Sequence, residues 1–200
     1  LYGDYDIDAK TYVSGQISYA FGDNDIQRGT VAAGNFREFD YDSDTFAISA
    51  EVGHALRASE RVAFVPRLGL NYLNYSADEH TDPNLGTIDP ESLDMFEAII
   101  GADLQFTHEN SDGSVLKPYV SAEFGYDFVG DEVETTTTFA GANTAAFTTE
   151  GFDSQDERFN IGTGLTFHST ENWELAADYE YEIRDDFDSH TGALKASFKF

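Results

Sequence analysis

The stretch WELAADYEYEIR, residues 173–184, alternates between apolar and polar side chains along its whole length. One set of alternate positions is apolar or aromatic and comprises Trp173, Leu175, Ala177, Tyr179, Tyr181 and Ile183. The other set carries the charge and comprises Glu174, Ala176, Asp178, Glu180, Glu182 and Arg184. Successive side chains of a β-strand point to opposite faces, so this period of two predicts a strand with one apolar and one polar face.

The same alternation extends along the rest of the chain, where helical periodicity is nearly absent. It recurs in residues 13–21, 46–53, 62–72, 96–106, 116–128, 159–167 and 194–200, and in a shorter segment at 1–7. We therefore predict an all-β fold, an antiparallel meander of about nine strands. These strands are about 10 to 14 residues long, whereas strands of soluble proteins are usually about 5–6 residues long.

The strand length separates two architectures. A strand that crosses a bilayer at a tilt needs about 9–11 residues, and these segments reach that length. The polar positions carry small residues and isolated charges of both signs, which is typical of the wet lumen of a transmembrane β-barrel. The candidate lumen charges are Arg67, Glu97, Asp103, Lys117, Glu123, Asp178, Glu180, Lys195 and Lys199. These charges either act in transport or only keep the lumen wet and pair with one another.

Aromatic residues gather near the ends of the predicted strands. They include Tyr19, Phe21, Tyr72, Phe106, Tyr126, Phe128, Tyr179 and Tyr181. An aromatic ring with a polar edge is favoured between lipid and water, so these residues predict the interfacial girdles of a membrane barrel.

The predicted connections alternate between short and long. Short connections are expected near residues 8–10, 57–60, 108–113 and 169–172, and long ones near 23–42, 75–91 and 130–156. Outer-membrane barrels have short periplasmic turns and long outer loops, so the short turns and Phe200 should lie at one end of the sheet. The short last hairpin, near residues 185–189, is the exception.

The composition excludes several classes of function. The chain has 38 acidic and 11 basic residues and a net charge of −27, which argues against binding to nucleic acid. It contains no Cys, which excludes disulfides, thiol catalysis and Cys-based zinc sites. The mean hydropathy of −0.41 excludes a bundle of membrane helices. No cofactor is expected.

Two acidic motifs were considered as metal sites or active sites. Asp40, Asp42 and Asp44 have the spacing of a calcium loop, but Thr45 stands where that loop needs Gly. We expect exposed carboxylates there, with binding of divalent ions that bridge lipopolysaccharide left open. The cluster Asp185, Asp186, Asp188 and His190 lies on one tight turn without an opposed pair of carboxylates to hold a water, so no catalytic residue is predicted.

None of the five His residues stands two or four residues from another, so a His-rich metal site has no local support. They are His54, His80, His108, His168 and His190. No metal is therefore expected.

The C-terminal segment LKASFKF resembles the assembly signal of bacterial outer-membrane proteins, which ends in an aromatic residue preceded by apolar residues at every second position. The matching residues are Leu194, Ala196, Phe198 and Phe200. The resemblance implies recognition by the barrel-assembly machinery. It departs from the common form at Lys195, where that form has Gly.

The wider chain resembles the translocator domain of autotransporters. The matching segments include RVAFVPRLGLNY, FEAIIGADLQF and LKPYVSAEFGYDF, and their order follows the family across almost all 200 residues. Barrels of this family have twelve strands preceded by a helix in the pore. The resemblance therefore implies that residues 1–200 are one barrel domain that lacks the helix and the first strands. The absence of an initiating Met and of a signal peptide leads to the same expectation.

The resemblance implies a translocator barrel in the bacterial outer membrane that exports an N-terminal passenger or anchors it at the cell surface, without enzymatic activity. Its implied partners are membrane lipid, lipopolysaccharide, the assembly machinery and its own passenger. The alternative is a small outer-membrane pore, or a surface adhesin whose loops bind and which has no passenger. The sequence upstream of Leu1 would discriminate between the two.

Overall fold

The computed structural model describes residues 1–29, 36–82, 85–130, 134–139, 145–151, 156–170, 172–185 and 187–198. The main sheet follows the path β1 (Tyr2–Asp6), β2 (Thr11–Gly29), β3 (Phe36–His54), β5 (Val62–Ala77), β8 (Leu93–Phe106), β10 (Val115–Asp127), β13 (Glu157–His168), β14 (Trp173–Arg184) and β15 (Phe187–Phe198). The short strands β4 (Leu56–Arg57) and β9 (His108–Glu109) pair with β5 and β10. Within these ranges, no helix is long and apolar enough to cross a membrane.

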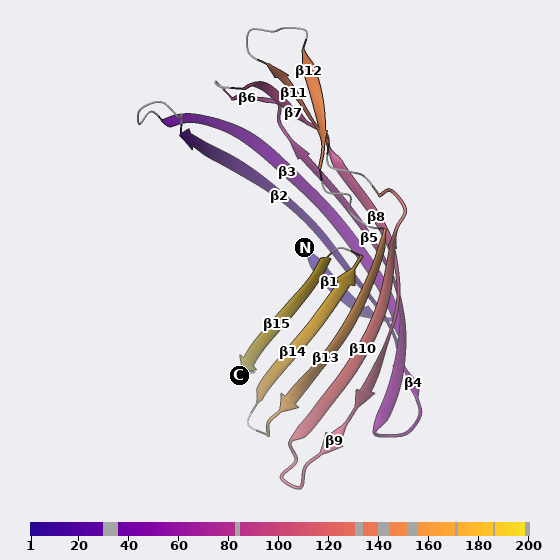
Figure 1. Cartoon of the computed structure of the whole chain (residues 1–200). Helices are drawn as coiled ribbons and strands as arrows, with labels where there is room; N and C mark the ends of the chain where they lie inside the picture. Colours follow the sequence, from indigo (N-terminus) through magenta and orange to yellow (C-terminus); the bar gives the residue numbers. More distant parts are fainter. Residues whose placement is uncertain are drawn as a thin grey trace.

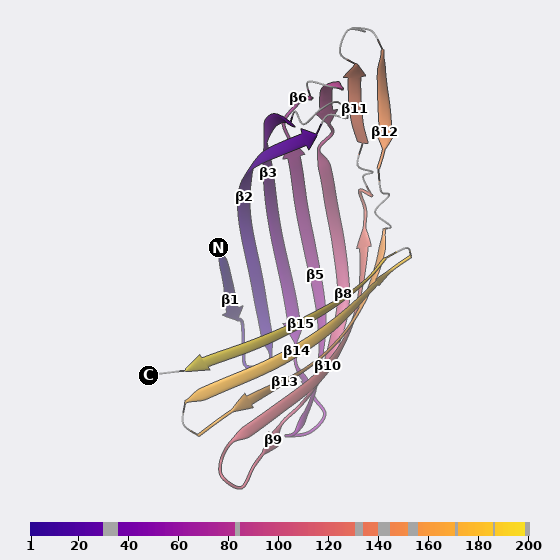
Figure 2. The same ribbon diagram turned by 60° about the vertical axis from the view of Figure 1, so that its left-hand side comes forward.

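Neighbouring strands of this path are also neighbours in sequence, apart from the short strands between them, so the main sheet is the predicted antiparallel meander. The sheet is strongly curved (Figure 1). Along the described path its two edges are β1 and β15, which do not pair with each other. Figure 2 shows β2, β3, β5 and β8 side by side, with β13, β14 and β15 running obliquely across their lower parts.

The topology confirms the predicted alternation of connections. The turns between β1 and β2, β4 and β5, β9 and β10, and β13 and β14 all lie at one end of the sheet, called the turn end here (Figure 1). Phe198, the last described residue, pairs with Trp173 at that end. Phe200 itself lies outside the described residues.

The structure corrects the predicted long connections. β2 and β3 do not stop near residues 23 and 42, because their pairing continues from Asp23 opposite Asp42 to Gly29 opposite Phe36. The other two long connections fold into a second sheet of β12 (Ala146–Glu150), β11 (Glu134–Phe139), β7 (Gly86–Pro90) and β6 (His80–Asp82). This sheet stands at the end away from the turns (Figure 1). β15 also begins earlier than predicted, at Phe187.

Burial is inverted relative to a soluble protein. The apolar face of the main sheet is exposed; Ile100, for example, has 60% of its surface accessible. The polar face is the more buried one, with Glu97 at 4% and Arg158 at 9%. Among the described residues, Phe39 and Val65 are the buried apolar residues. A sheet with an apolar outer surface and buried charges suits lipid outside and water inside.

Candidate functional site: a polar network across the sheet

Arg67 on β5 is the centre of the first half of a polar network. Its Nη1 atom lies 2.9 Å from Oε2 of Glu51 on β3, and its Nη2 atom lies 3.0 Å from Oδ1 of Asp103 on β8. The same Nη2 atom lies 3.5 Å from Oε2 of Glu123 on β10. The hydroxyl of Tyr12 on β2 donates a 2.8 Å hydrogen bond to Glu51. Three carboxylates thus surround one guanidinium.

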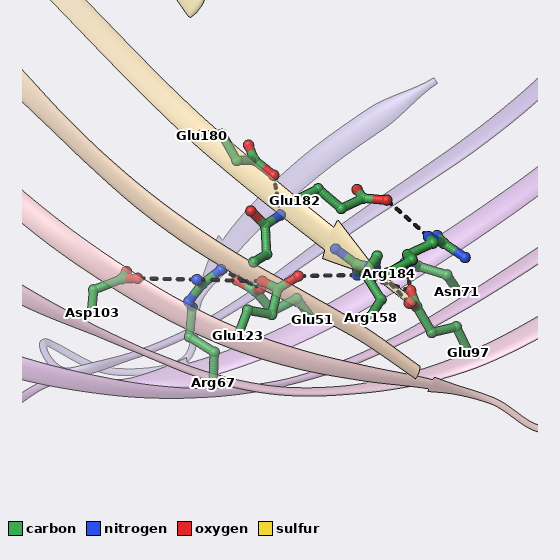
Figure 3. A network of polar contacts seen from close by, with 11 residues as sticks. Glu51, Arg67, Asn71, Glu97, Asp103, Glu123, Arg158, Glu180, Glu182 and Arg184 are labelled. Carbon is green, nitrogen blue, oxygen red and sulfur yellow. Dashed lines mark hydrogen bonds and ion pairs between the residues drawn. The ribbon is translucent and has the colours of Figure 1, made fainter. Parts of the chain in front are cut away.

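Arg158 on β13 is the centre of the second half. Its Nε and Nη2 atoms donate to the two carboxylate oxygens of Glu97 at 2.7 and 3.0 Å, a bidentate ion pair. Nη2 also lies 3.1 Å from Oε1 of Glu123. Asn71 donates a 3.0 Å hydrogen bond to Glu97. Since Glu123 contacts both arginines, the two halves form one network (Figure 3).

Glycines make this long-range pairing possible. Gly101 stands opposite both Arg67 and Glu123, so the strand between them carries no side chain at that level. A Cβ added at Gly125 would overlap the Glu97 carboxylate. The curvature of the sheet brings the long side chains of separate strands toward one another (Figure 3).

The remaining candidate lumen charges lie on the same face but outside this network. Asp178 accepts a 2.9 Å hydrogen bond from the Tyr119 hydroxyl, and Glu180 contacts the amide of Asn160. Lys117 and Lys195 have no ion-pair partner among the described side chains. Lys199 lies outside the described residues.

Sequence reasoning missed several members of the network. Arg158 is not in the predicted strand, which begins at Phe159. It nevertheless lies two residues before Asn160, and so on the polar face of that strand. Glu51 lies in the predicted strand 46–53, but nothing in the local sequence marks it as a partner of Arg67. Tyr12 and Asn71 are typical strand residues, and nothing in the local sequence marks their partners.

Hydrogen bonds between a Tyr hydroxyl and an Asp carboxylate recur on the apolar face, near its end away from the turns. The Tyr19 hydroxyl donates to Asp44 at 2.7 Å, and the Tyr72 hydroxyl donates to Asp94 at 2.7 Å. Tyr126 repeats the arrangement, with its hydroxyl 3.3 Å from Asp156. Each pair places a ring toward the apolar belt and a carboxylate at its edge, as an interfacial girdle requires.

The acidic motifs do not form metal sites in the described part of the chain. Asp40 and Asp42 stand opposite Asp25 and Asp23 in the β2–β3 ladder. No group of described His, Asp and Glu residues is arranged to hold a metal ion. His190 accepts or donates a 2.7 Å hydrogen bond with the Tyr179 hydroxyl and lies 3.5 Å from Asp188. Asp186 lies outside the described residues.

The C-terminal segment places its apolar residues on the exposed face. Leu194 is 88% accessible, and Ala196 stands opposite Leu175. The Phe198 ring packs on Trp173, with ring centroids 5.0 Å apart. These residues are therefore available for contact with lipid or a partner.

The curved antiparallel sheet, its exposed apolar face and its buried ionic network define a transmembrane β-barrel domain. The family model "Autotransporter beta-domain" matches residues 1–180, and the chain therefore belongs to the autotransporter family.

Two curated relatives are outer membrane protein B of Rickettsia typhi (strain ATCC VR-144 / Wilmington) and outer membrane protein B of Rickettsia prowazekii (strain Madrid E). Each is 24% identical over 186 residues, which cover 91% of this chain and 11% of the relative. The chain thus spans 11% of the length of these relatives.

The fold is similar to a solved structure, the translocator domain of autotransporter NalP from Neisseria meningitidis. The TM-score is 0.64 at 21% identity, and the match covers 98% of this chain and 63% of that chain. With the family match and the two outer-membrane relatives, the chain is a β-barrel domain of the bacterial outer membrane.

Proposed function

We propose that this domain inserts into the outer membrane and exports an N-terminal passenger or anchors it at the cell surface. The observation that carries the proposal is the inverted burial of the sheet, with an exposed apolar belt around a buried ionic network. In this function Arg67, Glu97, Asp103, Lys117, Glu123, Asp178, Glu180, Lys195 and Lys199 line a water-filled lumen. An ionic wall offers a crossing polypeptide few dry apolar contacts, so the polypeptide does not adhere through apolar side chains.

Closure of the barrel is part of this proposal. An open sheet would leave two edges of unpaired backbone groups in hydrocarbon, at several kcal/mol for each group. We propose that residues 1–200 are the larger part of a twelve-stranded barrel. Further strands, together with the pore helix, would come from residues N-terminal to Leu1 in the whole protein. The coverage of only 63% of the NalP chain supports this proposal.

We propose that conduction and anchoring involve no catalysis and no cofactor. The barrel-assembly machinery would read the exposed side chains of Leu194, Ala196 and Phe198 together with Phe200. Lipid would contact the apolar belt, and divalent ions would bridge the carboxylates at its outer edge to lipopolysaccharide.

The experiment follows the passenger of the whole protein, carrying an epitope tag, on intact bacteria. Leu194→Asp places a charge in the apolar belt and should abolish surface exposure of the tag. Lys195→Asp, the matched control, places the same group on the polar face opposite Ala176 and should leave exposure within about twofold. Surface exposure of the tag after deletion of residues 1–200 would overturn the proposal.

The second sheet favours one other function, a surface adhesin. β6, β7, β11 and β12 form a separate sheet beyond the main sheet (Figure 1). In a barrel with no passenger, a signal peptide would directly precede the barrel strands. Sequencing the gene upstream of Leu1 therefore discriminates between the two functions.

A further inference from the structure

The basic side chains of the described chain fall into two groups. Arg67, Arg158 and Arg184 each form an ion pair with a carboxylate. Lys10, Lys195, Arg57, Arg61 and Lys117 have no ion-pair partner among the described side chains, and the last three line one cavity. In a chain with 38 acidic and 11 basic residues, three unpaired cations in one place require an explanation.

These three cations surround one cavity of about 320 Å³. The register places the cavity on the polar face, because Arg57 stands opposite Ala63, Ala63 opposite Gln105, and Gln105 opposite Tyr119. Lys117 stands opposite Thr166 on the same face. The cavity lies where β4, β5, β8 and β10 reach the turn end, so it opens at the turn-side mouth of the polar face.

The chemistry of the lining fits an acidic ligand. Arg57, Arg61 and Lys117 supply positive charge, and Gln105 and Thr166 supply uncharged hydrogen-bonding groups. Glu60 is the single carboxylate of the lining, so the charge of the cavity is positive. At the opposite end of the sheet, Asp23 faces Asp42 and Asp25 faces Asp40. An acidic group is therefore attracted at this mouth and repelled at the far end.

An extended polypeptide matches the shape of this site. Alternate side chains of an extended segment lie about 6.6 Å apart on one side, so two or three acidic residues can meet cations spread over neighbouring strands. A cavity of about 320 Å³ has room for a few side chains and none for a folded domain.

We propose that the turn-side mouth binds acidic, extended segments of the polypeptide that enters the barrel. The inference rests on the proposed translocation function and specifies the sequences that this function favours. Exposed ion pairs are individually weak and are screened by salt, so the segment is held at entry and released as it advances.

The test uses the whole protein in detergent micelles and fluorescently labelled peptides of twelve residues. One peptide alternates Asp and Glu with Gly and Ser, the second has Asn and Gln at the acidic positions, and the third has Lys. Fluorescence anisotropy should show binding of the acidic peptide, at least tenfold stronger than of the other two. Raising the salt from 0.05 to 0.5 M should remove this preference.

The double variant R57Q/R61Q should weaken binding of the acidic peptide at least fivefold. K10Q/R184Q also removes two positive charges, but neither Lys10 nor Arg184 lines the cavity, so this double variant should bind within twofold of wild type. Inorganic phosphate should displace the peptide no better than NaCl of equal ionic strength. Equal weakening by both double variants, or displacement by phosphate at far lower ionic strength, would overturn the inference. Passenger export is scored separately, so normal export without peptide binding leaves the proposed function intact.

Discussion

Arg158 and Glu97 form a bidentate ion pair although a whole strand, β10, lies between the strands that carry them. The pair crosses β10 close to Gly125, where an added Cβ would overlap the Glu97 carboxylate. The pair adds a side-chain link between β8 and β13, which are not neighbours in the sheet. The curvature of the sheet and the network thus depend on each other.

Arg158→Met should destabilise the domain by about 3 kcal/mol, because it leaves Glu97 buried without its cation. Lys117→Met, which removes a cation without an ion-pair partner in the described part of the chain, should change the stability by less than about 0.5 kcal/mol. Urea titration of the whole protein in lipid vesicles measures both. Similar losses of unfolding free energy for the two variants would show that pairing with Glu97 gives Arg158 no special contribution to stability.

Gly125→Ala should cost about 1–3 kcal/mol, since the added methyl group forces the Glu97 carboxylate away from Arg158. Gly192→Ala on β15 is the matched control, because no atom lies within 4 Å of a Cβ built there. We expect the control to match wild type or to exceed it slightly. The same urea titration applies, and a neutral Gly125→Ala would contradict the tight fit.

Ile100 and Ile99 are adjacent on β8 and point to opposite faces. Ile100→Arg should cost about 2–4 kcal/mol if this level lies near the bilayer midplane, because the charge would face lipid. Ile99→Arg would face the carboxylates of the polar network and should cost about 1 kcal/mol or less. Refolding of the whole protein into vesicles measures both, and equal costs would contradict the assignment of the two faces.

The turn before β10 should loosen in acid. Asp112 accepts hydrogen bonds from the backbone and hydroxyl of Ser114 at 2.9 and 2.7 Å, and these bonds lower the pKa of Asp112 below its ordinary value of 3.8. A depressed folded pKa contributes stability above pH 3.8 that is lost as the pH falls through the folded value. The protection of the Ser114 amide against hydrogen exchange, relative to its intrinsic rate, should therefore fall as the pH drops through the folded pKa of Asp112. In Asp112→Asn this pH-dependent loss of protection should be absent.

Direct closure between β1 and β15 can be tested by crosslinking. Every pairing along the described path is antiparallel, and an odd number of strands leaves β1 and β15 running in the same direction. Residues 1–200 contain no Cys, so cysteines introduced at Asp6 and Ser197 are the pair to be scored within this domain. In the whole protein we expect no disulfide between them. Efficient crosslinking in a monomer would show a nine-stranded barrel and would refute the twelve-stranded proposal.

The sequence predicted the main sheet because its signal is local. Alternation in segments such as Trp173–Arg184 identifies each strand, and short turns force neighbours to pair. The extension of β2 and β3 was missed because Asp23 and Asp42 resemble a solvated loop. Backbone pairing does not require apolar side chains, so composition fails as a guide there. The Thr-rich strand β11 was missed for the same reason.

The polar network could be predicted only in part. The parity of the strands placed Arg67, Glu97, Asp103 and Glu123 on one face, and the structure brings these four together. Which carboxylate meets which arginine depends on strand stagger and curvature. Neither the stagger nor the curvature can be read from one segment of sequence. The sequence therefore does not predict that Gly125 leaves room for the Glu97 carboxylate.

The extended pairing of β2 and β3 carries the main sheet well beyond the end of the apolar belt. Tyr19 and Asp44 mark the edge of the apolar belt, yet the ladder continues to Gly29 opposite Phe36. At about 3.3 Å per residue, this ribbon reaches roughly 25–30 Å farther along the strand direction, a distance similar to the thickness of the hydrocarbon core. The ribbon and the second sheet thus both stand beyond the lipid on this side (Figure 1). The acidic ladder of the ribbon repels other anionic surfaces at that distance from the membrane.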